Sequence, residues 1–253
     1  MPTGKIKRFF RSLRREGVSR TVSSTIEYIA VGMRRRARAL GILTGLIEPT
    51  LYHNRKRTDS ELRWEMIVKH LDSNDTTALD IGCADGFFTA KLADEGMTVE
   101  GIDVKADRLA SARKAWGDKK GVKFTQKTID PESIRSLPNV DVVLLLTVYH
   151  HWVTQNGRDV AEVMLRELAT RSNKIFFEPP GTVDQQEVYQ KWPIGGRPVK
   201  SGEKVAEYYL EILESVFDST VSITYIGEAE YTDGRGRTDP LFVINCRDYR
   251  ISE

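Results

Sequence analysis

Two glycines and an aspartate are the residues whose types and spacing first suggest chemistry. Gly82 and Gly86 bracket a turn between a short apolar segment and a helical one. A ligand can approach such a turn closely and meet the positive end of the helix. Asp103 follows the next apolar segment, and a carboxylate there can accept both hydrogen bonds of a ribose diol. The pattern therefore predicts a cofactor that contains adenosine.

The turn itself argues against a dinucleotide cofactor. Counted from Gly82, the dinucleotide fingerprint has glycines at its third and sixth positions, where this chain has Ala84 and Phe87. The segment Asp80-Ile81-Gly82-Cys83-Ala84-Asp85-Gly86 resembles the first motif of the class I S-adenosylmethionine-dependent methyltransferases. In that motif an acidic residue precedes three alternating glycines, of which the middle one is Ala84 here. The resemblance covers about residues 63–247.

The resemblance implies that the cofactor is S-adenosyl-L-methionine and suggests roles for several residues. Asp103 corresponds to the family's ribose-binding acid, and Asp130 to the residue that commonly approaches the adenine amino group. Asp80 is expected to orient the turn. Because Asp130 precedes Pro131, it has an alternative role as a cap for the turn of residues 131–136. The predicted cofactor-binding residues are Asp80, Gly82, Cys83, Ala84, Gly86, Asp103, Asp130 and Thr147.

The methyl acceptor is expected beyond the fourth and fifth predicted strands. His150 and His151 are candidate bases, since an imidazole can remove a hydroxyl proton near neutral pH; His150 is preferred, and a structural role is the alternative. The Asn/Asp-Pro-Pro-aromatic motif of relatives that methylate amines is missing, as is the Glu-x-x-Glu-His arrangement of metal-dependent relatives. No metal is expected. The predicted acceptor-binding residues are Tyr149, Trp152, Glu178, Trp192 and Arg197.

Alternating strands and helices must position these residues. The capping-box spacing of Thr58 and Glu61 predicts a helix that includes residues 62–71. Short apolar segments predict five strands, at residues 77–81, 98–103, 122–127, 141–147 and 174–178. Helices are predicted at residues 87–95, 106–116, 159–170 and 204–216. The near-continuous apolar run of the fourth strand is typical of a strand buried on both faces of a parallel sheet.

Two further strands, at residues 220–226 and 241–246, leave no room for a crossover helix between them. They must therefore form an antiparallel pair. The predicted fold is α/β, a doubly wound, mostly parallel seven-stranded sheet with a terminal antiparallel hairpin, plus a basic N-terminal helical extension. Ligands bind such sheets at the carboxyl ends of the strands. The predicted domains are residues 1–57, the extension, and residues 58–253, the methyltransferase domain.

The charge of the chain is distributed unevenly. The formal charge of all 253 residues is +2, but residues 1–40 hold 11 basic and two acidic residues and so carry +9, which leaves −7 for the rest. Apolar residues recur at helical spacing in this segment: Ile6, Phe9, Phe10 and Leu13. An amphipathic cationic helix suits an anionic membrane surface. Nucleic acid, organellar targeting and packing on its own domain are the alternatives.

The composition fits a globular protein, with 40% hydrophobic and 29% charged residues. It excludes disordered, collagen-like and integral membrane proteins, and two distant cysteines provide no disulfide framework. The predicted function is O-methylation of a small-molecule, sugar or lipid-linked acceptor by a cytoplasmic enzyme, peripheral at a membrane through residues 1–40. The alternatives are an RNA methyltransferase, which the basic segment favours, and a non-catalytic cofactor-binding module.

Overall fold

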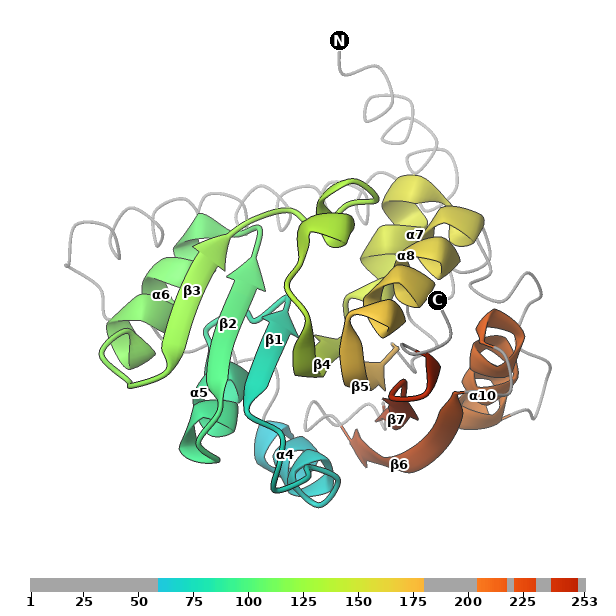
Figure 1. Cartoon of the computed structure of the whole chain (residues 1–253), viewed down its shortest axis with the longest axis horizontal. Coiled ribbons are helices and arrows are strands. Elements are labelled where there is room, and N and C mark those ends of the chain that lie inside the picture. Colours follow the sequence, from blue (N-terminus) through green and yellow to red (C-terminus); the bar gives the residue numbers. More distant parts are fainter. Residues whose placement is uncertain (1–58, 180–203, 218–220, 231–237, 250–253) are drawn as a thin grey trace, which may run out of the picture. The chain divides into compact units, whose positions relative to one another are not determined.

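The structure is a computed structural model, and it describes residues 59–179, 204–217, 221–230 and 238–249. These residues form a seven-stranded sheet flanked by helices (Figure 1). The strand order is β3-β2-β1-β4-β5-β7-β6; β1 to β5 pair in parallel, and β7 is antiparallel to both of its neighbours. The predicted sheet and its terminal antiparallel hairpin are confirmed. The basic extension lies outside the described residues.

The bounds of the elements agree closely with the prediction for the first five strands. The strands are β1 (Thr77–Ile81), β2 (Thr98–Asp103), β3 (Val122–Gln126), β4 (Val140–Leu146), β5 (Ser172–Glu178), β6 (Ser222–Glu230) and β7 (Thr238–Asn245). The helices are α4 (Ser60–Val68), α5 (Phe87–Asp94), α6 (Ala106–Trp116), the 3-10 helix η1 (Ser133–Ser136), α7 (Tyr149–Asn156), α8 (Arg158–Thr170) and α10 (Val205–Val216).

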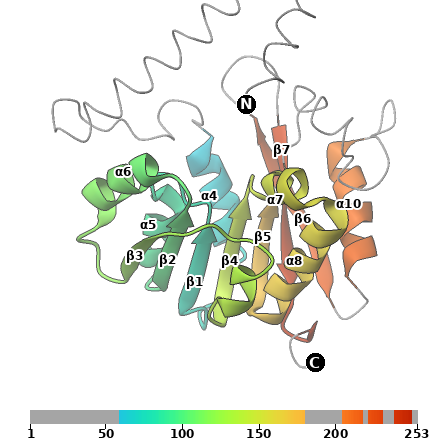
Figure 2. The ribbon, with the colours of Figure 1, turned by 90° about the horizontal axis from the view of Figure 1, so that it is seen from above.

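Strand β4 lies at the centre of the core and explains why its sequence is apolar throughout. Val142 and Leu144 pack on one face of the sheet, Val143 and Leu145 on the other, and all four are fully buried. Successive residues of a strand point to opposite faces, so a strand covered on both sides must be apolar at every position. Helices α4, α5 and α6 cover one face, and η1, α7, α8 and α10 cover the other (Figure 2).

The strand order reverses its direction at β1. The chain runs outward from β1 to β2 and β3, then returns to place β4 on the other side of β1. The crossover connections therefore diverge at the carboxyl ends of β1 and β4, which leaves a crevice there. Within the described ranges, none of the helices is both long and apolar enough to cross a membrane.

Three local predictions need correction. Helix α4 ends at Val68 rather than residue 71, and its N-cap residue Asp59 makes no side-chain capping bond. Glu61 pairs with Lys91 at 2.9 Å; the other member of the predicted capping box, Thr58, lies outside the described residues. Helix α7 occupies a segment for which no helix was predicted. The two hairpin strands are also longer than expected, and β6 has an irregular register next to Gly227 (φ 135°).

Candidate active site

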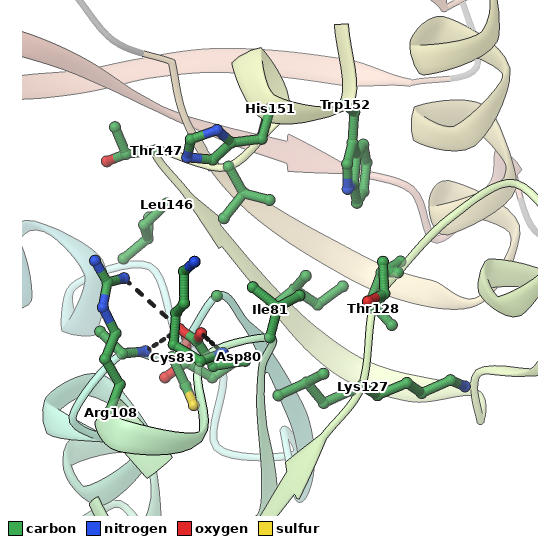
Figure 3. Close-up of a pocket in the computed structure, with 18 of the residues that line it drawn as sticks. Asp80, Ile81, Cys83, Arg108, Lys127, Thr128, Leu146, Thr147, His151 and Trp152 are labelled. Atoms are coloured by element: carbon green, nitrogen blue, oxygen red, sulfur yellow. Dashed lines mark hydrogen bonds and ion pairs between the residues drawn. The ribbon is translucent and has the colours of Figure 1, made fainter. Parts of the chain in front are cut away.

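A cavity of about 480 Å³ opens at the carboxyl ends of β1, β2 and β4. This volume suits a small-molecule ligand. Figure 3 shows Asp80, Cys83 and Arg108 on one side of the cavity, with Thr147 and His151 on the other. Its lining includes nine of the residues predicted from the sequence: Asp80, Gly82, Cys83, Ala84, Asp103, Thr147, His150, His151 and Trp152.

The turn after β1 requires glycine at its first position. Gly82 has a positive φ of 81°, and a Cβ atom there would overlap a methyl group of Val148. The N–H groups of Gly82 and Cys83 both donate to the carbonyl oxygen of Ile102, at 2.7 and 3.0 Å. Glycine therefore lets the β4–α7 turn approach the first turn closely.

Gly86 has a structural role rather than a place in the cavity lining. It precedes α5 with a φ of 80°, and a Cβ atom there would lie 2.6 Å from the ring of Phe124. The Gly86 N–H donates to the Cys83 carbonyl oxygen at 2.8 Å. Gly86 thus allows α5 to start against β3, which orients the end of the turn.

Asp103 fixes the turn at the position where the family motif has its middle glycine. Ala84 takes a left-handed backbone (φ 51°), and its N–H donates to Oδ2 of Asp103 at 3.0 Å. The other carboxylate oxygen, Oδ1, accepts the N–H of Lys105 at 2.7 Å. Arg108 Nη1 lies 3.9 Å from Oδ2. Each carboxylate oxygen has two lone pairs, so Asp103 can hold the turn and still accept ribose hydroxyls.

Asp80 lies buried beneath the turn, 3% exposed, and accepts the hydroxyl of Thr89 at 2.6 Å. Burial raises the pKa of Asp80 to about 7, and the negative charge of Asp103 adds to the increase, while the Thr89 hydrogen bond opposes it. Burial also raises the pKa of the Cys83 thiol. Cys83 is therefore a neutral packing residue at neutral pH, whereas Asp80 can gain or lose a proton there.

Helix α7 places the two histidines at the cavity. Their rings are 3.9 Å apart between centroids, at an angle of 41°. The Nδ1 atom of His150 is buried and has no hydrogen-bond partner among the described residues. Burial, with His151 as a second cause, lowers the pKa of His150 to about 3. His150 is therefore neutral at pH 7, but it is a weak base.

His151 stands in a different environment on the same helix. Its side chain is exposed to solvent, and its ring faces the cavity opposite Arg108 (Figure 3). Partial burial of the ring lowers its pKa from 6.5, the charge of Arg108 lowers it further, and the charge of Asp103 raises it. His151 is neutral at pH 7 and accessible to a second ligand.

Of the predicted acceptor-binding residues that the structure describes, one lines the cavity and two do not. Trp152 is 3% exposed and lines the cavity. Tyr149 is 1% exposed and packs in the core with its ring 5.4 Å from that of Phe177, because it lies on the side of α7 that faces the core. Glu178 is fully buried and does not line the cavity. The geometry gives no support to acceptor contacts by Tyr149 or Glu178. Trp192 and Arg197 lie outside the described residues.

Asp130 takes the alternative role that the sequence suggested. Its Oδ1 accepts the N–H groups of Ser133 at 2.8 Å and Glu132 at 3.2 Å, so it caps the turn that becomes η1. These bonds, that of Ser133 foremost, lower the pKa of Asp130. Asp130 is not part of the cavity lining, to which Thr128 and Ile129 contribute instead.

Several lining residues were not predicted from the sequence. Arg63 of α4 reaches the cavity although it is only 3% exposed. Val104, directly after Asp103, is an apolar residue with 49% exposure at the cavity. The sequence signal for Val104 was its place next to Asp103, the predicted ribose-binding acid. Arg63 carried no comparable signal. The other unpredicted lining residues include Phe88, Lys105, Arg108, Lys127, Ile129 and Gln155.

The comparisons with known proteins agree with this geometry. Residues 79–171 match a family model described as a methyltransferase domain. This segment contains the glycine turn, Asp103 and both histidines. The chain contains a class I S-adenosylmethionine-dependent methyltransferase domain. The strand order, with its terminal antiparallel hairpin, is the one expected for this family.

Two curated relatives resemble the methyltransferase domain. The O-antigen chain terminator bifunctional methyltransferase/kinase WbdD of Escherichia coli is 28% identical over 130 residues, which are 47% of this chain and 18% of that protein. The ubiquinone biosynthesis O-methyltransferase of Erwinia tasmaniensis is 29% identical over 118 residues, which are 46% of this chain and 47% of that protein. The chain thus spans less than half the length of either relative.

Solved structures support the fold of the methyltransferase domain. The structure of WbdD, a kinase-methyltransferase, has a TM-score of 0.59 and 22% identity, over 74% of this chain and 40% of that chain. Magnesium protoporphyrin IX methyltransferase from Synechocystis PCC 6803, with bound S-adenosylhomocysteine, has a TM-score of 0.52 and 19% identity, over 85% of this chain and 94% of that chain.

The residues of the cavity fit the cofactor of the methyltransferase domain. Gly82 lets a ligand approach the turn closely. The Asp103 carboxylate, held by two backbone N–H groups, suits a ribose, and the exposed apolar surface of Val104 suits an adenine ring. Asp80 and Asp103 also give this wall negative charge, which suits a cation. The cofactor is S-adenosylmethionine.

Proposed function

We propose that this protein transfers a methyl group from S-adenosylmethionine to a hydroxyl of a small-molecule, sugar or lipid-linked acceptor. S-adenosylmethionine supplies an electrophilic methyl group on a cationic sulfur. The observation that carries the proposal is that one cavity joins the cofactor-binding turn to the histidines of α7. Such an arrangement holds two ligands next to each other and lowers the entropic cost of their reaction.

In this proposal the donor lies against the β1–β2 side of the cavity. Asp103 accepts the ribose hydroxyls, and Val104 and Ile129 contact the adenine ring. The Asp80 carboxylate beneath the turn favours the positive charge of the donor. Trp152 provides an apolar wall and excludes water.

His151 is the better candidate for the base that removes the hydroxyl proton. A general base works best when its pKa is near the working pH. His150, with a pKa of about 3, is far from that condition. His151 is exposed, and the charge of Asp103 opposes the burial and the charge of Arg108 that lower its pKa. We therefore assign His151 as the base, in place of His150, which sequence reasoning preferred. His150 packs against the ring of His151.

The acceptor class rests on the chemistry of the histidines, and the names of the relatives are consistent with it. One relative is a chain terminator of O-antigen and the other a ubiquinone O-methyltransferase. An anionic membrane surface for residues 1–40 stays a prediction, because this segment lies outside the described residues. A peripheral membrane location would bring the protein to a lipid-linked acceptor.

Label transfer tests the proposed function. The full chain is incubated with methyl-labelled S-adenosylmethionine and with three separate acceptor preparations: glycolipids, small polar metabolites and total RNA. Label in the glycolipid or metabolite preparation, at an oxygen atom, is the expected result. Label in RNA alone would replace the proposed acceptor with the alternative one, and no label in any preparation would contradict the activity.

Donor binding should release a proton at neutral pH. Asp80, with a pKa of about 7, is about half protonated in the donor-free protein, and a cation in the cavity favours the carboxylate. We expect a release of about 0.5 proton per donor at pH 7. Calorimetry in phosphate and in Tris buffer measures this number, because the two buffers differ in ionisation enthalpy. Asp80→Asn should remove the dependence on buffer; the same dependence in that variant would contradict the assignment.

A further inference from the structure

We infer that Glu178 and Thr147 form a clamp that positions helix α7, and with it both histidines, beside the donor-binding turn. Glu178 is a positioning residue in this account, because it is fully buried and does not line the cavity. The catalytic meaning of the clamp rests on the proposed function. The structural part of the inference depends only on the contacts of these two residues and their neighbours.

Thr147 has a backbone conformation that needs outside support. Its φ is 58°, in the left-handed region, although it is a β-branched residue. Such residues are rare there and remain only where the surrounding structure holds them. The strained residue directly follows β4, which ends at Leu146, and α7 begins two positions later at Tyr149. The conformation of Thr147 therefore sets the direction in which the histidine-bearing helix leaves the sheet.

Glu178 supplies the support with both its backbone and its side chain. The N–H of Thr147 donates to the Glu178 carbonyl oxygen at 2.7 Å, which extends the pairing of β4 and β5 by one residue. The Thr147 hydroxyl donates to Oε2 of Glu178, also at 2.7 Å. A charge-assisted hydrogen bond of this kind is stronger than a neutral one. Glu178 thus holds both the backbone and the side chain of Thr147.

Oε2 of Glu178 also binds a residue of α4, the helix that covers the other face of the sheet from α7. Arg63 Nη1 of α4 donates to Oε2 of Glu178 at 3.0 Å. The guanidinium is itself held by Asp59, at 3.3 Å from Nε, and lies over the ring of Phe88 at 4.8 Å. Because this group is 3% exposed and lines the cavity, the clamp connects the donor-binding wall with the turn that carries α7.

Val148 adds a direct contact between the clamped turn and the donor-binding turn. Its methyl group occupies the space that a Cβ atom on Gly82 would need. Its carbonyl oxygen accepts the N–H of His151 at 2.8 Å. A displacement of Thr147 would therefore move both the packing on Gly82 and the first turn of α7.

The test removes the hydroxyl of Thr147 and measures the environment of His150. Thr147→Val keeps the shape of the side chain and loses the bond to Glu178; Thr147→Ser keeps the hydroxyl. In the full wild-type chain, NMR titration of the histidine rings should show no titration of His150 between pH 5 and 8. In Thr147→Val, α7 should loosen and hydrate this ring, so its pKa should rise toward the ordinary value of about 6.5 and the ring should titrate within this pH range.

Matched variants make the result specific. Thr125→Val removes another threonine–glutamate hydrogen bond, to Glu100 between β3 and β2, far from α7 in the strand order. Thr125→Val and Thr147→Ser should both leave the His150 titration unchanged. His150→Gln identifies the resonance. If Thr147→Val does not fold, Thr147→Ala replaces it, because alanine lacks the hydroxyl and, without a branch at Cβ, is less strained than valine at a positive φ.

The outcomes separate the clamp from the proposed function. A His150 titration that is the same in Thr147→Val, or in the variant that replaces it, as in the wild type would overturn the clamp. An equal shift in Thr125→Val would also overturn it. Calorimetry with S-adenosylhomocysteine is run on the same samples: no binding by the wild type would contradict the proposed function, whatever the His150 titration shows.

Discussion

Replacement of Asp103 by alanine should weaken the binding of S-adenosylmethionine about 100-fold or more. A hydrogen bond to a charged group contributes about 1.5–3 kcal/mol, and the loss of two ribose bonds therefore predicts at least this change. The variant also leaves the N–H groups of Ala84 and Lys105 without their acceptor, so the turn should lose its shape. Isothermal titration calorimetry measures the effect.

A carboxylate on the same strand provides the control. Glu100 is partly buried in β2, accepts the Thr125 hydroxyl and pairs with Lys123 at 3.0 Å, but does not line the cavity. Glu100→Ala should therefore lower stability without changing donor affinity. Equal affinity in Asp103→Ala and the wild type would show that the donor binds elsewhere.

Replacement of His151 by alanine should reduce turnover by a factor of about 10²–10⁴, the usual contribution of a general base. Donor affinity should change little, because Asp103 and the glycine turn remain. The assay uses the acceptor preparation that takes up label from S-adenosylmethionine. Since the pKa of His151 is lowered from 6.5, wild-type turnover should hold between pH 8 and 6.5 and decrease only below that range, as the imidazole gains a proton.

The neighbouring histidine is the matched control for this prediction. His150→Ala removes a ring of the same type on the same helix, 3.9 Å from that of His151. We expect a smaller loss of turnover than in His151→Ala, because the pKa of His150 is too low for a base at pH 7. A larger loss in His150→Ala, or full activity in His151→Ala, would contradict the assignment of the base.

The donor side of the site was predictable because its signals are local. The apolar run of β1 and the turn from Gly82 to Gly86 lie in one short segment, and Asp103 ends the next strand. Chain order alone then brings them together, since the carboxyl ends of adjacent parallel strands lie at one edge. Asp130 shows the limit of such reasoning, because its side chain forms a local cap instead of turning to the cavity.

The acceptor side was less predictable because helix α7 has no strong local signal. Its sequence contains aromatic and β-branched residues of low helix propensity. The helix forms because Tyr149, Trp152 and Val153, at helical spacing, pack into the core. That packing turns the two histidines to the cavity and the Tyr149 side chain away from it. Sequence reasoning selected two histidines that line the cavity, but it did not predict the helix that positions them.

Buried charges were the other feature that the sequence could not place. Arg63 precedes β1 and Glu178 ends β5, yet their side chains meet at 3.0 Å. No local pattern joins residues so distant in the chain. Glu178 was predicted to bind the acceptor because the acceptor was expected beyond the fourth and fifth strands; the alternative was that it merely ends its strand. Its burial explains why a carboxylate stands there: it pairs with Arg63 and holds Thr147.

A structure of the full chain with S-adenosylhomocysteine tests the central claim most directly. The ribose hydroxyls should lie on the carboxylate of Asp103, and the sulfur should face His151 across the space left for the acceptor. An acceptor oxygen in that space would lie about 3–3.5 Å from the methyl carbon that it attacks. A ribose bound away from Asp103, or a sulfur facing away from α7, would contradict the claim that this cavity joins a methyl donor to a histidine base.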